Sequence, residues 1–185
     1  MPLTRPMTIL ALSGSLREAS AATAILRAMI PMAPAGVTMK LFEGLNDLPH
    51  FNPDIDIEPF PESVLHLRRS IAEADGLIIG TPEYAFAMPG VLKNAFDWLV
   101  SSGEILNKPT VTISSSPSSP GGDKAHASLL LVMQALSTAI PEGGSLTVPF
   151  TKKRISATGQ ITDPLLLDEL HTLLRHLLKQ IESNK

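Results

Sequence analysis

Short apolar runs that alternate with amphipathic helical patterns constrain the fold of this chain most strongly. The run "DGLIIGT" at 75–81 is continuously apolar, which is typical of a parallel strand buried on both faces. Similar short runs predict strands over 7–13, 37–42, 75–81, 109–115 and 145–150. The longer patterns between and after them predict helices over 21–29, 65–74, 92–99, 123–139 and 163–182.

Alternating strands and helices of these lengths build a parallel sheet with helices on both faces and right-handed crossovers. We therefore predict an α/β fold, a three-layer, doubly wound, five-stranded parallel sheet of the flavodoxin-like type with strand order 2-1-3-4-5. The chain has no internal repeat and no interdomain linker, so residues 1–185 are expected to form a single domain.

Composition excludes several classes of function. The net charge is −3 and no dense cluster of lysine and arginine is present, which argues against a nucleic-acid partner. The chain has no cysteine, so disulfides, thiolate catalysis and cysteine-based metal sites are excluded. Its five histidines lack metal-ligand spacing, so we expect no metal and assign them surface or capping roles. Neither a signal-peptide pattern nor an apolar run of membrane-spanning length is present, and we expect a cytoplasmic protein without a membrane partner.

A loop rich in hydroxyl groups, "SGSLREAS", follows the first predicted strand. Ser13, Ser15 and Ser20 supply hydroxyl donors, and Arg17 supplies a planar cation suited to phosphate. The helix that follows presents free N–H groups at its start, which attract anions. The loop lacks the Lys-Ser/Thr ending of a P-loop, so its donors suit a single terminal phosphate. The alternative interpretation is a simple helix cap made by Ser20.

The segment "TPEYAFAMPG", which leaves the third predicted strand, is a second candidate ligand loop. It can lay backbone amides and the rings of Tyr84 and Phe86 against a planar ligand. The alternative is an ordinary turn with both aromatic residues packed in the core. Phe96 and Trp98 lie inside the next helix, where we expect core packing or a subunit interface.

A third loop, "SSSPSSPGGDKA", follows the fourth predicted strand. Gly121 and Gly122 permit close approach of the backbone to a ligand, although they could equally form a flexible hinge. In open α/β sheets ligands bind outside the carboxyl ends of the strands, where the strand order reverses. The loops after strands one, three and four are therefore expected to converge on one site.

The longest irregular stretch, residues 44–63, carries four prolines. A loop of this length in a compact domain is usually functional or disordered. Its acidic residues Asp54, Asp56 and Glu58 lack the glycine and distal glutamate of a calcium loop, so we interpret them as a solvated acidic loop.

These fragments in combination resemble one protein family. The pieces that carry the resemblance are "GSLREAS", "LPHFNPD", "PEY" with "PGVLKNAFDWL", and "SSSP" followed by "GGDKA". Together they resemble the NAD(P)H-dependent FMN reductases of the flavodoxin-like fold, a group that includes quinone, azo-dye and chromate reductases. The resemblance runs from Met7 to the final helix.

The resemblance implies an oxidoreductase that passes hydride from NADPH or NADH to FMN and then to a small acceptor such as free flavin or a quinone. It implies no catalytic side chain, because the flavin carries the chemistry. It also implies a homodimer or homotetramer. The resemblance implies three sets of FMN contacts. The first loop would contact the phosphate through Ser13, Ser15, Leu16, Arg17 and Ser20, and the second would contact the ring edge through Pro82, Glu83, Tyr84 and Ala85. The third loop would contact the far side of the ring through Ser115, Ser116, Gly121 and Gly122. The alternative is a non-catalytic flavodoxin-type electron carrier, although such carriers are usually more acidic.

Two departures from the family pattern concern flavin affinity. The family often has asparagine at the positions of Ala22 and Ala85, and each alanine removes an amide that could donate a hydrogen bond. Each lost bond weakens binding by roughly three- to tenfold. We therefore expect FMN to bind more loosely here than in typical members.

Overall fold

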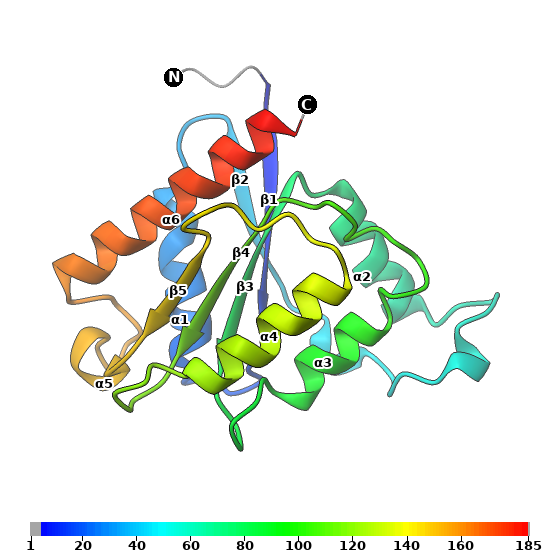
Figure 1. Cartoon of the computed structure of the whole chain (residues 1–185), viewed down its shortest axis with the longest axis horizontal. Coiled ribbons are helices and arrows are strands. Elements are labelled where there is room, and N and C mark those ends of the chain that lie inside the picture. The colour runs from blue at the N-terminus through cyan, green and yellow to red at the C-terminus, as the bar shows by residue number, and fades with distance from the viewer. Residues whose placement is uncertain (1–4, 185) are drawn as a thin grey trace.

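The computed structural model describes residues 5–184 and confirms the predicted sheet. All strand pairs are parallel, and the order is β2-β1-β3-β4-β5 (Figure 1). The five strands are β1 (Met7–Ser13), β2 (Val37–Phe42), β3 (Gly76–Pro82), β4 (Thr110–Ser115) and β5 (Ser145–Val148). Each strand run expected from the sequence is therefore present, with its ends displaced by two residues at most.

Helices cover both faces of the sheet and produce the expected three layers. The helices α1 and α6 pack on one face, and α2, α3 and α4 pack on the other. Their bounds are α1 (Ala21–Met29), α2 (Glu62–Glu73), α3 (Gly90–Asp97), α4 (Asp123–Ala135), α5 (Thr151–Arg154) and α6 (Pro164–Ser183). No helix within residues 5–184 is long and apolar enough to span a bilayer.

The central strand β3 explains why the sequence shows a continuous apolar run there. Ile78 packs into the core beneath α1 and α6, whereas Leu77 and Ile79 pack into the core on the opposite face. All three side chains are fully buried. A strand covered on both faces needs apolar residues at successive positions rather than at alternate ones.

Two elements near the C-terminal half are shorter than the sequence suggested. The fifth strand ends at Val148, because Pro149 has no N–H to donate and Phe150 has a left-handed φ of 54°. The next residues form the short helix α5, which the sequence did not predict. Helix α4 ends at Ala135 rather than at residue 139, because Ser137 has a φ of 52° and breaks the helical run.

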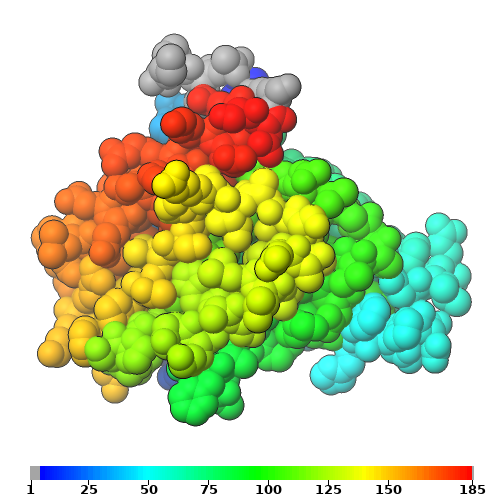
Figure 2. Space-filling model, in the orientation of Figure 1, coloured from blue at the N-terminus to red at the C-terminus, as the bar shows by residue number. Residues whose placement is uncertain are grey.

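The long segment between β2 and α2 is held by hydrogen bonds to side chains of the neighbouring helices. It contains two 3₁₀ turns (Leu45–Asp47 and Pro53–Ile55), and part of it stands out from the body in Figure 2 (cyan, right). The side chain of Asp56 is only 7% exposed and accepts a 2.7 Å hydrogen bond from Arg68. The interpretation of this stretch as a solvated acidic loop is therefore wrong for Asp56.

Trp98 reaches the same segment from the end of α3. Its indole Nε1 donates a 2.9 Å hydrogen bond to the carbonyl of Pro49. Trp98 and Phe96 are fully buried in the core beneath α2, α3 and α4. The expectation of core packing is confirmed for both residues, and the interface alternative is wrong.

Candidate functional site

The three predicted loops meet at the carboxyl edge of the sheet, at the lower end of the strands in Figure 1. The register pairs Ser13, the last residue of β1, with Gly80 in β3, and pairs Pro82 with Ser115 at the ends of β3 and β4. The hydroxyls of Ser15 and Tyr84 approach to 3.5 Å and connect the first loop to the second.

The hydroxyl groups of the first loop give it a fixed shape. Ser13 Oγ lies 2.7 Å from Thr23 Oγ1 on α1, and it also accepts a 3.3 Å bond from the backbone N–H of Ser15. Ser20 caps α1 by accepting a 3.2 Å bond from the backbone N–H of Thr23, so the capping interpretation is confirmed. This bond uses a lone pair of the Ser20 oxygen and leaves its hydroxyl hydrogen for another acceptor. Leu16 and Arg17 are exposed at the tip.

The second loop is a tight turn with exposed aromatic side chains. Tyr84 and Ala87 exchange two 3.0 Å backbone hydrogen bonds, and the residues between them have left-handed φ values of 49° (Ala85) and 62° (Phe86). These values define a type I′ turn, which Asn-Gly normally favours. Tyr84 is 43% exposed and Phe86 is 78% exposed. The alternative that both rings pack in the core is therefore wrong.

Glu83 connects the second loop to the third. One of its carboxylate oxygens accepts hydrogen bonds from the backbone N–H groups of Lys124 (3.1 Å) and Ala125 (3.0 Å). A carboxylate at the first turn of a helix is stabilised by the free N–H groups and by the helix dipole. The start of α4 is therefore held by one oxygen of the chain's own carboxylate.

The third loop turns sharply at two glycines with left-handed φ values of 66° (Gly121) and 83° (Gly122). A Cβ on Gly121 would lie 2.9 Å from the backbone nitrogen of Pro149, so any larger residue would collide with the end of β5. Ser116 Oγ is paired with Ser118 Oγ at 2.7 Å. Glycine is required here by both backbone conformation and space.

Ser115 carries a buried hydroxyl that has no hydrogen-bond partner among residues 5–184. Buried polar atoms normally have partners, and an exception points to a ligand or a water. This hydroxyl lies at the carboxyl end of β4, on the edge that carries the first and second loops. Spare hydroxyl donors, a cationic Arg17 and an exposed aromatic turn together suit a flat molecule with a phosphate tail, so the residues present fit FMN.

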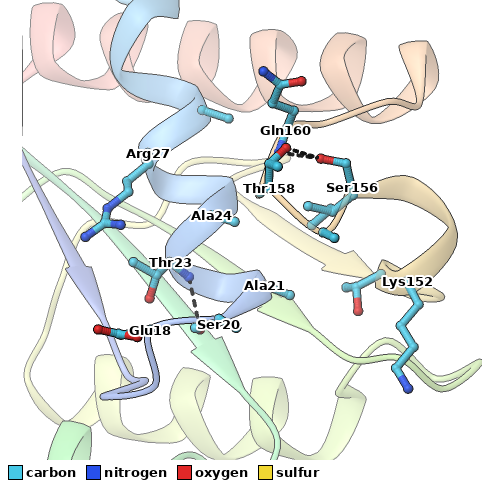
Figure 3. Close-up of a pocket in the computed structure, with 16 residues that line it drawn as sticks. Glu18, Ser20, Ala21, Thr23, Ala24, Arg27, Lys152, Ser156, Thr158 and Gln160 are labelled. Carbon is cyan, nitrogen blue, oxygen red and sulfur yellow. Dashed lines mark hydrogen bonds between the residues drawn. The ribbon is translucent and has the colours of Figure 1, made fainter.

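Two cavities flank the first loop. One of about 670 Å³ lies between α1 and residues 151–160 and includes Ser20, and Figure 3 shows it with the side chain of Arg27 turned away from Ser156. The other, of about 360 Å³, lies on the side of β2 and includes Ser13, Ser15, Leu16 and Arg17. Both volumes are within the range of ligand sites.

Thr23 and Arg27, which sequence reasoning missed, line both cavities. They are four residues apart on α1 and therefore share one helix face. This spacing, three and seven residues after the capping serine, is the signal that could have identified them.

Comparison with known proteins decides the family. A family model described as NADPH-dependent FMN reductase matches residues 7–153. The chain belongs to this family. A quinone reductase of Escherichia coli K12 is 29% identical to this chain over 172 residues, which cover 91% of this chain and 92% of the relative. An NAD(P)H-dependent FMN reductase of Pseudomonas aeruginosa is also 29% identical, over 94% of this chain and 92% of its own.

A solved structure agrees with both the family and the fold. The flavoenzyme NAD(P)H:acceptor oxidoreductase FerB of Paracoccus denitrificans superposes with a TM-score of 0.83 at 28% identity, covering 96% of this chain and 98% of its own. The expected flavodoxin-like fold is confirmed. The expectation of an oxidoreductase that uses FMN and a reduced nicotinamide is confirmed by the family.

Proposed function

We propose that the three loops hold FMN with its phosphate at the first loop and its ring between the second and third loops. The observation that carries this orientation is the contact between Ser15 and Tyr84, because it joins the donor-rich loop to the exposed aromatic turn. The backbone amides and side chains that we assign to FMN are those of Ser13, Ser15, Leu16, Arg17, Ser20, Pro82, Glu83, Tyr84, Ala85, Ser115, Ser116, Gly121 and Gly122.

Bound FMN supplies the redox chemistry, and the side chains bind and orient it. Arg17 would neutralise the phosphate and the serine hydroxyls would hold it, and the exposed rings of Tyr84 and Phe86 would border a flat slot beside the flavin. Donor and acceptor use this slot in turn, so ping-pong kinetics are expected. We assign a quinone as the acceptor class, since a flat ring fits such a slot and a relative is named a quinone reductase.

We also propose that the enzyme works as a homodimer or homotetramer in the cytoplasm. Val100, Leu106 and Leu131 are exposed apolar side chains, and they belong to α4 and to the chain that follows α3. Burial of these side chains against a second subunit would remove apolar surface from water, which supports the proposal. Analytical ultracentrifugation tests the assembly, and a monomer at micromolar concentration would contradict it.

The decisive experiment on the activity is a visible spectrum of the purified protein with FMN, taken before and after NADPH is added. The flavin absorption should bleach with NADPH and return when a quinone is added, with many turnovers of NADPH per enzyme. A protein that binds FMN but turns over neither NADPH nor NADH would instead be an electron carrier of the flavodoxin type.

A further inference from the structure

A chain of side-chain hydrogen bonds runs through the interior from β5 to the glycine turn of the third loop. Ser145 Oγ lies 3.1 Å from Thr112 Oγ1, which lies 2.9 Å from Nε2 of His126. On the other side of the imidazole, Nδ1 lies 3.1 Å from Ser114 Oγ, and Ser114 donates a 3.0 Å bond to the carbonyl of Gly121. This series of hydrogen bonds therefore ends on the turn that we assign to FMN.

His126 is the buried centre of this series of hydrogen bonds. It is only 4% exposed, so the sequence expectation of a surface or capping role is wrong for this histidine. Thr112 and Ser114, which contact its two ring nitrogens, are fully buried. Burial lowers the pKa of His126, which favours the neutral ring. A neutral imidazole has one N–H donor and one bare nitrogen acceptor, so its two neighbours must be matched to the tautomer.

The contacts of Ser114 identify the tautomer. Its single hydroxyl hydrogen is given to the carbonyl of Gly121, so its oxygen must accept from His126. The ring hydrogen is therefore on Nδ1, and the bare Nε2 accepts from the hydroxyl of Thr112. Every hydrogen bond then points in the same direction, from β5 toward the glycine turn, and each hydroxyl hydrogen and the ring N–H has an acceptor.

We propose that His126 is a positioning residue of the flavin site, which acts through Ser114 to hold the carbonyl of Gly121 in place. This inference rests on the proposed location of FMN. Gly121 and Gly122 have no side chains of their own, and glycine loses more conformational freedom than any other residue when it is fixed. The bond from Ser114 is thus a side-chain restraint on the carbonyl of this turn.

Two conservative variants of His126 each remove the hydrogen bond on one side of the imidazole and keep the other. In His126→Asn the amide nitrogen takes the place of Nδ1 and keeps the donor to Ser114, but Thr112 loses its acceptor. In His126→Gln the longer side chain keeps an acceptor at the position of Nε2, but Ser114 loses its donor. Ser114→Ala removes the last link directly. Met133→Val, a buried change on the same helix away from the turn, is the control for general loss of stability.

The affinity for FMN, measured by quenching of flavin fluorescence, distinguishes positioning from packing. We expect His126→Asn and Met133→Val to stay within about threefold of the native dissociation constant, and His126→Gln and Ser114→Ala to bind roughly tenfold more weakly. A role in packing alone predicts that the larger glutamine is tolerated at least as well as asparagine. Equal affinities for the two His126 variants, or native affinity for Ser114→Ala, would overturn the proposal.

A second measurement needs no flavin. Nitrogen-15 NMR of histidine-labelled protein should show the Nδ1–H tautomer for His126 in the ligand-free state. The Nε2–H tautomer would contradict the direction assigned to these hydrogen bonds. If the native protein does not bind FMN at all, the proposed function fails. If it binds FMN while the variants do not differ, only the role of His126 fails.

Discussion

The turn at Ala85 and Phe86 makes a prediction whose sign is unusual. Ala85 has a φ of 49°, in the left-handed region, which costs an L-residue with a Cβ about 1–2 kcal/mol. Glycine avoids this strain but loses about 0.5–1 kcal/mol in conformational entropy. The difference predicts that Ala85→Gly stabilises the fold by about 0.5–1 kcal/mol. For a domain of this size, that raises the melting temperature by about 1–4 °C.

Ala87 provides the matched control, because it lies two residues away in the same hairpin without a left-handed φ. Ala87→Gly should lower stability by about 0.5–1 kcal/mol, since there the entropy cost is not offset by relief of strain. Thermal unfolding followed by circular dichroism measures both variants. If Ala85→Gly lowers the melting temperature as much as Ala87→Gly does, the strain argument is refuted.

Asparagine at position 85 tests flavin affinity as well. Asparagine tolerates the left-handed region better than alanine does, and its amide can donate a hydrogen bond. Ala85→Asn should therefore bind FMN roughly three- to tenfold more tightly, whereas Ala85→Gly, which adds no donor, should not gain this increment. An unchanged affinity in the asparagine variant would show that the side chain at position 85 does not reach the flavin.

Further predictions concern three other side chains. Glu83→Gln should destabilise the fold by about 1 kcal/mol in urea unfolding, because a neutral amide oxygen is a weaker partner for the α4 amides. Ser115→Ala should leave the flavin-free melting temperature unchanged, because its hydroxyl has no partner within residues 5–184, while FMN binds roughly three- to tenfold more weakly. Burial alone would raise the pKa of Asp56, but hydrogen bonds from Ser101 and Arg68 outweigh it and hold the pKa below the ordinary 3.8. The ionised carboxylate of Asp56 therefore stabilises the fold above pH 3.8, and this stabilisation is lost as the pH falls through the folded pKa. Asp56→Asn should lower the free energy of unfolding by about 2 kcal/mol at pH 7 and by less below pH 3.8.

The sheet order and the site edge could be predicted from the sequence because each has a local signal. Alternating runs specify a parallel α/β sheet, and ligand-type loops after three strands must meet where the carboxyl ends of those strands meet. The hydroxyl of Ser20 as a helix cap is also a local signal, because the helical pattern begins at the next residue. Each of these features is marked by residues that lie close together in the sequence.

The features that the sequence could not supply depend on distant contacts. Glu83 and Lys124, in the first turn of α4, are 41 residues apart, and no motif marks a carboxylate that caps a helix from another loop. His126 has helical spacing with the buried Leu129 and Met133, but its hydrogen-bond partners Thr112 and Ser114 on β4 follow only from the fold. The Ala85–Phe86 turn has residues that rarely form a type I′ turn, so its shape is set by the surrounding fold.

The central claim, that the first loop holds the phosphate of FMN, is tested most directly by comparing FMN with riboflavin, which lacks the phosphate. Fluorescence titration of the native protein should show FMN binding at least tenfold more tightly than riboflavin, and Arg17→Gln should remove most of this preference. Equal affinities for the two flavins in the native protein, or a preference unaffected by Arg17→Gln, would contradict the account.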